Sequence, residues 1–348
     1  MADNTYNKRD RILGAYFGSA AGDALGGPVE GWHAKMIKAV HNRVDHFLPY
    51  TGVLHPGYAL VADPGAITDD TFIKDDFASF VLAFPNEADR TKDNLVKFML
   101  VNGDFNTWYW PDVVPLRFIA EGGTYEEAQK IRMGGGAAWW TSFGLIHAGD
   151  PQAAYDETVR LSSVWKEPFE QNLIASVQAG VAASVIPGAT VESVVNTVLD
   201  FAGPLAKKLL LRARRIAWEN DGNLDGMIEQ LYEEALVEQC TGEIDGPMPP
   251  KALATNPYRG ATVMWAEQIP LAFATFIFGK GHFLDTMVAV ANTGRDTDSI
   301  ASTTGSWIGG LVGYSGMPKD WVDTMQRVNI NHINLIERAT KLAALAGA

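Results

Sequence analysis

The sequence predicts an all-α protein that forms one compact domain over residues 1–348. Apolar residues recur at helical spacing in most segments, and few segments alternate between apolar and polar residues. Hydrophobic residues make up 47% of the chain, which is an ordinary globular composition. Neither a tandem repeat nor a low-complexity linker divides the chain, although its length would permit two domains.

The first predicted helix, residues 8–25, is rich in glycine, alanine and serine. Small side chains let two helices approach closely, so we expect this helix to lie at the centre of the fold. Asp150 followed by Pro151, and Asn223, are typical of helix starts. Further helices are predicted near residues 69–84, 92–102, 124–131, 151–163, 169–186, 190–202, 205–218, 223–238, 265–279, 282–292, 298–313 and 319–345.

Three long segments collect the glycines, prolines and aromatic residues, namely 47–66, 102–123 and 241–260. Loops of this length inside a compact domain are usually functional or disordered. Aromatic clusters occur at Trp108–Trp110 and at Trp139–Trp140. They could stack on a base or a sugar, or they could belong to the hydrophobic core.

Charge and composition exclude several classes of partner. The formal net charge is −13, which argues against nucleic acid because phosphate binding needs clustered Lys and Arg. Cys240, the single cysteine, supports neither an internal disulfide nor a zinc framework. The polar first residues do not resemble a signal sequence, and the longest apolar runs are too short to span a bilayer. We therefore expect a cytoplasmic protein with no membrane partner.

Two acidic clusters each precede an apolar helix. The segment TDDT (68–71) holds adjacent acids, and GRDTDS (294–299) holds two acids separated by one residue. Each cluster could simply start a helix, where acids suit the helix dipole. Crowded carboxylates repel unless cations neutralise them, and Mg²⁺ prefers oxygen ligands. We therefore expect a binuclear metal site formed by Thr68, Asp69, Asp70, Asp296, Asp298 and Ser299.

Three other acid-rich patterns do not match. Calcium EF-hands need a D-x-[DN]-x-[DN]-G segment, which DTDSIA lacks. The His-Asp pair of metal-dependent phosphohydrolases occurs here only in reverse, as Asp45-His46. Isoprenoid synthases need an acid three residues after the Asp pair, where this chain has Ile73.

Four motifs follow one another along the chain: ILGAYFGSAAGDALGGPVEG (12–31), TDDT (68–71), MGGGAAWWTSFGL (133–145) and GRDTDSIAS (294–302). In this order and at these separations they resemble the motifs of the ADP-ribosylglycohydrolase family over essentially the whole chain. The resemblance implies a single compact, orthogonal multi-helix bundle with a central cleft that holds two Mg²⁺ ions. Mn²⁺ would suit the same oxygen ligands.

The resemblance also implies roles for particular residues. Glu30 matches the acid beside the metals and is expected to act as general acid or base in glycoside hydrolysis. The six residues of the two acidic clusters match the metal ligands. Gly134, Gly135 and Gly136 match the segment that binds the ribose and phosphates. The expected activity is Mg-dependent cleavage of the glycosidic bond of ADP-ribose conjugates, whether small molecules or proteins.

The chain departs from the family pattern in its central glycine segment. Gly135 stands where the family commonly has Asn, and Trp139 and Trp140 replace a Met-Arg pair. These departures leave the ADP-ribose contacts unassigned. Two alternative functions therefore remain, namely a hydrolase of small ribosides or nucleosides and a non-catalytic ADP-ribose-binding relative. Arg295 could pair with an acid or meet a substrate phosphate. Asp23 could orient metal-bound water or be a polar residue near a helix end.

Overall fold

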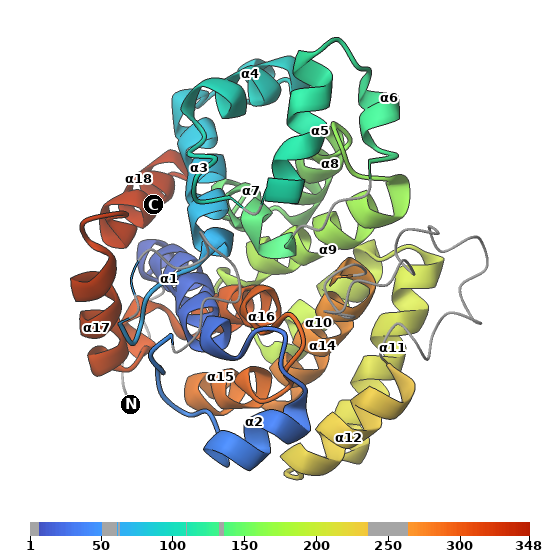
Figure 1. Ribbon diagram of the computed structural model, residues 1–348, viewed down its shortest axis with the longest axis vertical. Coiled ribbons are helices and arrows are strands. Elements are labelled where there is room, and N and C mark those ends of the chain that lie inside the picture. The colour runs from blue at the N-terminus through green and yellow to red at the C-terminus, as the bar shows by residue number, and fades with distance from the viewer. Residues whose placement is uncertain (1–6, 51–60, 62, 109, 132–135, 236–263) are drawn as a thin grey trace.

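The computed structural model describes the chain except for residues 1–6, 51–60, 62, 109, 132–135 and 236–263 (Figure 1). Its described part is helical and contains no β-strand, which confirms the all-α prediction. The α-helices are α1 (Lys8–Gly26), α2 (Ala34–His41), α3 (Asp69–Ala83), α4 (Lys92–Asn102), α5 (Trp110–Ala120), α6 (Tyr125–Ala128), α7 (Thr141–Ile146), α8 (Pro151–Ser162), α9 (Pro168–Ser184), α10 (Val191–Phe201), α11 (Pro204–Glu219), α12 (Leu224–Glu234), α14 (Met264–Phe278), α15 (Phe283–Ala291), α16 (Thr297–Val312), α17 (Lys319–Asn329) and α18 (Leu335–Leu345).

Many helices begin where the sequence offers a capping side chain. Asp150 accepts a hydrogen bond from the backbone of Ala153 and starts α8 ahead of Pro151. Asn223 accepts one from Gly226 and starts α12. These side chains satisfy first-turn N–H groups that have no partner within the helix, so local sequence alone fixes these boundaries.

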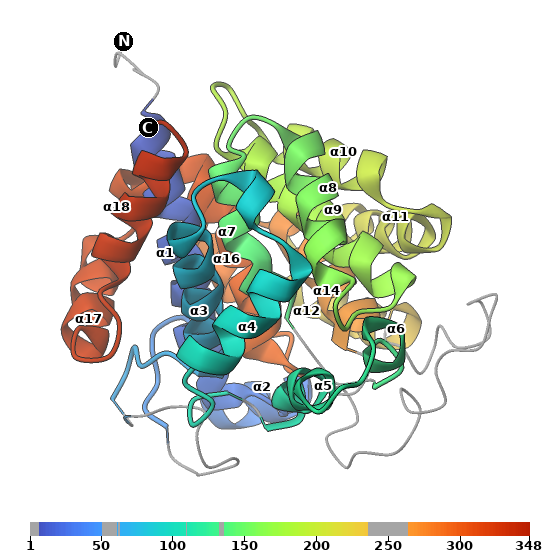
Figure 2. The same ribbon diagram turned by 90° about the horizontal axis from the view of Figure 1, so that it is seen from above.

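Helices α1 and α16 pack against each other at the centre of the molecule (Figures 1 and 2). A Cβ on Gly18 would lie only 2.4 Å from the carbonyl oxygen of Gly305, and one on Gly22 only 2.0 Å from that of Ala301. The two backbones are therefore in direct contact, which confirms the central position predicted for the first helix. The contact places the C-terminal end of α1 beside the N-terminal end of α16, since a Cβ on Gly26 would lie 2.5 Å from the Thr297 carbonyl oxygen.

Three local predictions were wrong or incomplete. The helix predicted over 319–345 is two helices, because the chain turns after α17 and Asn334 caps a new helix by accepting from the Glu337 N–H at 3.1 Å. The segment 102–123, predicted as a loop, contains α5. Val113 and Leu116 of α5 are buried, so packing outweighs the prolines that suggested a loop. Helix α2 was not predicted.

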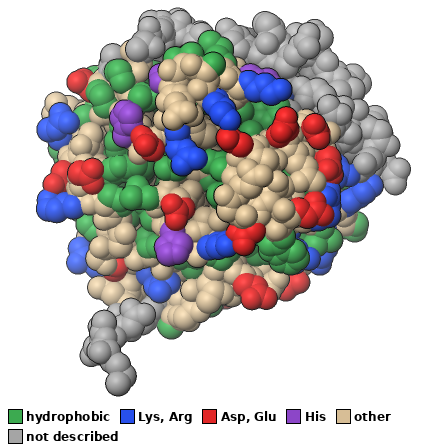
Figure 3. Space-filling model, turned by 90° about the horizontal axis from the view of Figure 1, so that it is seen from below, with side chains coloured by type: hydrophobic (Ala, Val, Ile, Leu, Met, Phe, Trp, Pro, Cys, Tyr) green, Lys and Arg blue, Asp and Glu red, His purple; other side chains and the backbone are tan. Residues whose placement is uncertain are grey.

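Several predicted features fall on residues that the structure does not describe. These are the loop 241–260, most of the loop 47–66, and Gly134 and Gly135. Figure 3 shows that acidic and basic side chains are interspersed on the face that it presents. Among the described helices, none combines the length and the apolar character needed to cross a bilayer.

Candidate functional site

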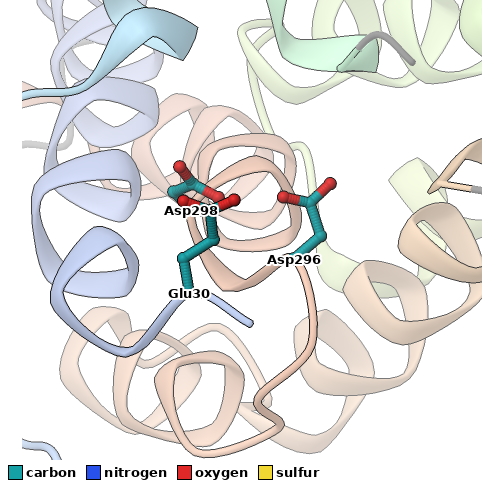
Figure 4. A group of neighbouring side chains, drawn as sticks. All are labelled: Glu30, Asp296 and Asp298. Atoms are coloured by element: carbon teal, nitrogen blue, oxygen red, sulfur yellow. The ribbon is translucent and has the colours of Figure 1, made fainter. Parts of the chain in front are cut away.

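Two chain segments bring three acids together at one end of α1. Glu30 follows the short 3₁₀ helix η1 (Gly27–Val29) that continues from α1, while Asp296 and Asp298 lie at the start of α16. One carboxylate oxygen from each of these three acids lies within 4.8 Å of the others. Figure 4 shows the three side chains pointing toward one another. The arrangement is a possible acidic metal-binding triad.

The first turn of α3 faces this triad and joins the two acidic clusters. The Ser299 hydroxyl donates to Asp70 Oδ2 at 2.6 Å, and the Thr68 hydroxyl lies 3.3 Å from Asp298 Oδ2. Thr68 also caps α3 by accepting from the Asp70 N–H at 3.3 Å. Both interpretations of the acidic clusters are therefore compatible. Each cluster starts a helix, and the two helix N-termini meet. All six predicted ligand residues are buried.

A short backbone pairing fixes Glu30 relative to Asp296. Gly31 N–H donates to the Arg295 carbonyl at 2.6 Å, and Arg295 N–H donates to the Trp32 carbonyl at 2.8 Å. The pairing needs a left-handed turn, with φ of 69° at Gly294 and 68° at Arg295. A Cβ on Gly294 would lie 2.3 Å from the Trp32 carbonyl oxygen, so only glycine fits there.

The Arg295 side chain pairs with an acid, which is one of the two roles that the sequence leaves open for it. Its Nε donates to Glu267 Oε1 at 2.6 Å and its Nη2 donates to Glu267 Oε2 at 3.0 Å. This forked pair anchors the aspartate loop to α14, because Glu267 is fully buried in the first turn of that helix.

Asp23, near the end of α1, holds the start of α3. Its carboxylate accepts from the Thr68 N–H at 3.0 Å, from the Thr68 hydroxyl at 2.5 Å and from the Thr71 N–H at 3.2 Å. Asp23 is fully buried. It therefore positions Thr68, and through it the acids that follow, rather than ending α1.

The central glycine segment reaches the site through Trp139. Its indole Nε1 donates to Asp70 Oδ1, and the ring is buried. A Cβ on Gly136 would lie 2.7 Å from the same Asp70 oxygen, so this glycine packs directly on the carboxylate. Trp140 instead belongs to the core, with its ring 4.6 Å from that of Phe77. Both rings lie in the buried core, and Trp139 in addition contacts the site through its indole N–H.

Two further side chains at the site were not indicated by the motifs. Gln268 donates from Nε2 to Asp296 Oδ2. The pair Glu267-Gln268 at the start of an otherwise apolar helix is the signal that could have revealed it. Tyr50 has a buried hydroxyl close to Gly27 and Thr68. Its position in a long loop gave no such signal.

Burial and mutual repulsion raise the pKa values of the clustered acids. Burial raises the pKa of Asp69 and Asp298 well above the usual range, and the Asp70 carboxylate adds to both shifts. Burial, followed by Asp298, raises the pKa of Glu30 in the same way. Burial raises the pKa of Asp70 only to about 6, because the donors Ser299 and Trp139 stabilise its ionised form.

The donor set fits a hard divalent cation. Carboxylates and hydroxyls from three segments converge in a buried space, and every candidate ligand atom is oxygen. Asp69 and Asp298 ionise reluctantly in the protein alone, and a bound cation would reverse that tendency by neutralising their charge.

Comparison with known proteins identifies relatives of this chain. The sequence pattern of the ADP-ribosylglycohydrolase family matches residues 4–347. The uncharacterized protein YegU of Escherichia coli (strain K12) is 25% identical over 357 residues, covering 97% of each chain. ADP-ribosylarginine hydrolase Tri1 of Serratia proteamaculans (strain 568) is 43% identical over 49 residues, which are 14% of this chain and 13% of that protein. A solved structure described as an ADP-ribosylglycohydrolase-related protein complex superposes with a TM-score of 0.62 at 18% identity, covering 97% of this chain and 99% of that one.

Proposed function

Because the chain belongs to the ADP-ribosylglycohydrolase family, we propose that it is a metal-dependent glycosidase that cleaves the glycosidic bond of ADP-ribose conjugates. Membership of this family supports a hydrolase. The short match to ADP-ribosylarginine hydrolases supports an ADP-ribosyl substrate for this chain.

The convergence of Glu30 with Asp296 and Asp298 carries the proposal. These acids come from residues far apart in the sequence, yet one oxygen of each lies within 4.8 Å of the others. Such crowding costs free energy in a protein that binds no cation, because burial and like charge both oppose ionisation. A function that uses a bound cation accounts for an arrangement that folding alone would disfavour.

We assign two Mg²⁺ ions to the site, held by the oxygen atoms of Thr68, Asp69, Asp70, Asp296, Asp298 and Ser299. Bound cations would polarise a water molecule and fix sugar hydroxyls. The surrounding contacts orient the ligands: Trp139 and Ser299 hold Asp70, and Gln268 holds Asp296. Neighbours of this kind fix the direction of a metal-binding carboxylate.

Glu30 is the residue that would move a proton. In hydrolysis a water oxygen forms a bond to the anomeric carbon while the bond to the leaving group breaks, and the leaving group takes up a proton. Burial, followed by the charge of Asp298, raises the pKa of Glu30, which is the direction that suits a carboxyl group acting as a general acid. The backbone pairing of Gly31 with Arg295 keeps the Glu30 carboxyl over Asp296 and Asp298 during this exchange.

Trp139 favours one alternative, a hydrolase of small ribosides or nucleosides. Its buried indole lies against Asp70, at one of the two positions where tryptophans replace the Met-Arg pair of the family pattern. A closed aromatic wall beside the acids suits a small substrate better than a protein-linked one.

Calorimetric titration of the Mg²⁺-loaded protein with ADP-ribose, with ribose as the control ligand, tests the proposal. We expect binding of ADP-ribose that disappears with a chelator and in Asp296→Asn. Turnover is then measured on ADP-ribosylated arginine and on a panel of nucleosides. Turnover of nucleosides without binding of ADP-ribose would replace the proposal by the riboside alternative. ADP-ribose binding without turnover of any substrate would indicate a non-catalytic relative.

A further inference from the structure

Tyr50 has a buried hydroxyl that has no hydrogen-bond partner among the described residues. The residue as a whole is partly exposed, whereas its hydroxyl is buried. Buried hydroxyl groups are usually paired, and each exception calls for a physical explanation. A partner absent from the folded chain itself is one such explanation.

The hydroxyl occupies a space that only glycine leaves open. A Cβ on Gly27 would lie 1.8 Å from Tyr50 Oη and 2.7 Å from Thr68 Cγ2. The hydroxyl therefore lies over the bare Cα of Gly27, at the junction between η1 and the cap of α3. Glu30 follows η1 directly, so the phenol is held next to the candidate site from the loop side.

The chemistry around the hydroxyl restricts what it can bind. Burial raises the pKa of the Tyr50 hydroxyl, and the charges of Asp23, Asp298, Glu30 and Asp69 raise it further. A phenol with a normal or raised pKa keeps its proton at neutral pH and can donate. An anionic phosphate oxygen would be repelled by these carboxylates, whereas a neutral sugar hydroxyl would not.

We propose that Tyr50 contacts the substrate, with its hydroxyl donating a hydrogen bond to a ribose hydroxyl oxygen held beside Glu30. This inference rests on the proposed function, because it takes a ribosyl group as the ligand. It assigns to Tyr50 a part in substrate recognition that the four motifs do not contain. It also gives a reason for Gly27, the last glycine of the segment GDALGG (22–27), which admits the phenol.

Two variants alter the proposed contact in different ways. Tyr50→Phe removes the hydroxyl and keeps the ring, while Gly27→Ala keeps the hydroxyl and displaces it. Tyr155→Phe is the matched control, because the Tyr155 hydroxyl accepts one hydrogen bond from Asn172 at 2.7 Å and plays no part in the candidate site. Thermal unfolding, Mg²⁺ affinity and ADP-ribose affinity of the Mg²⁺-loaded protein are measured for each variant by calorimetry.

We expect Tyr50→Phe to unfold at the wild-type temperature or above and to bind Mg²⁺ normally, because its hydroxyl stabilises nothing in the free protein. Its ADP-ribose affinity should fall about 2- to 13-fold, as for the loss of one hydrogen bond. Gly27→Ala should lose at least as much affinity, and Tyr155→Phe should lose none.

Each contrary outcome has a separate meaning. Unchanged ADP-ribose affinity in Tyr50→Phe, with binding by the wild type, would overturn the Tyr50 contact and leave the proposed function intact. Loss of Mg²⁺ binding in Tyr50→Phe would also overturn it, because the hydroxyl would then serve the metal site. Absence of ADP-ribose binding by the Mg²⁺-loaded wild type would overturn both the contact and the proposed function.

Discussion

The indole N–H of Trp139 donates to one carboxylate oxygen of Asp70, and the Ser299 hydroxyl donates to the other oxygen at 2.6 Å. Asp70 is therefore held from two sides, by a residue of the central glycine segment and by the first turn of α16. Neither donor is charged, so the two hydrogen bonds stabilise the ionised carboxylate without neutralising it. The direction in which Asp70 points thus depends on a tryptophan more than sixty residues away in the sequence.

Replacing Trp139 by Phe should weaken metal binding. The substitution keeps an aromatic ring but removes the donor to Asp70, and loss of such an orienting partner typically lowers metal affinity about 10-fold or more. Trp140→Phe is the matched control, because Trp140 is the neighbouring buried tryptophan and its Nε1 has no partner among the described residues. Calorimetric Mg²⁺ titration of both variants checks the prediction. Equal affinities in the two variants would contradict a specific role for the Trp139 N–H.

Glu30→Gln and Asp296→Asn should separate catalysis from metal binding. Glu30→Gln cannot transfer a proton, so kcat should fall about 100-fold or more while Mg²⁺ still binds. Asp296→Asn removes a ligand charge and should lose Mg²⁺ binding itself. Turnover assays with parallel Mg²⁺ titrations distinguish the two effects. Near-normal turnover in Glu30→Gln would exclude Glu30 as the proton-transferring residue.

Gly18→Ala should destabilise the protein, because the added methyl group forces α1 away from α16. The added Cβ would lie 2.4 Å from the Gly305 carbonyl oxygen, a backbone atom that cannot move aside alone. Overpacking of this kind costs about 2–3 kcal/mol. Ser19→Ala is the control on the same buried turn, because it adds no atom and removes a hydroxyl without a partner among the described residues. Urea denaturation measures both free energies of unfolding; a change below about 0.5 kcal/mol in Gly18→Ala would refute close backbone contact.

Removal of the metal should make stability fall as the pH rises. In the folded protein burial raises the pKa of Asp70 to about 6 and raises the pKa of Asp69 well above its usual range. Carboxyl groups of the unfolded chain titrate near pH 4. The folded state therefore retains protons that the unfolded state releases. This contribution is fully present below about pH 4 and is lost as the pH rises through the folded-state pKa values. Mg²⁺ binds the ionised carboxylates, so its stabilising effect should grow over the same range.

Thermal unfolding between about pH 5 and about pH 8, with a chelator and with Mg²⁺, measures this difference. Comparing the two samples removes the contribution that acids outside the site make to the pH dependence. One such acid is Asp76, whose burial raises its pKa to about 7 in both samples. Asp70→Asn should flatten the pH dependence of the chelated protein. A gap between the two samples that does not widen with pH would contradict cation binding by these carboxylates.

Local sequence was sufficient for most helix boundaries, because caps act within a few residues. Thr68 before α3 and Asp150 before α8 each bind a backbone N–H of the helix that they start. The exceptions were segments where packing decided. Helix α5 forms despite Pro115 because its apolar side chains are buried. The chain also breaks between α17 and α18, where one continuous helix was expected.

The sequence by itself determined which residues carry the acids and that both clusters begin helices. Four ordered motifs also sufficed to indicate the family, which the match over residues 4–347 establishes. Only the tertiary structure decided that Glu30 meets Asp296 and Asp298, because their approach depends on the glycine contact between α1 and α16 and on the pairing of Gly31 with Arg295.

The tertiary structure also decided which residues support those acids. Trp139, Gln268 and Tyr50 reach the site from three separate segments, and no local pattern predicts which acid or neighbour each side chain contacts. A cap or a helical period involves neighbours a few residues apart and can be read along the chain. A hydrogen bond across the fold depends on where the chain returns in space, and packing of the whole molecule sets that position.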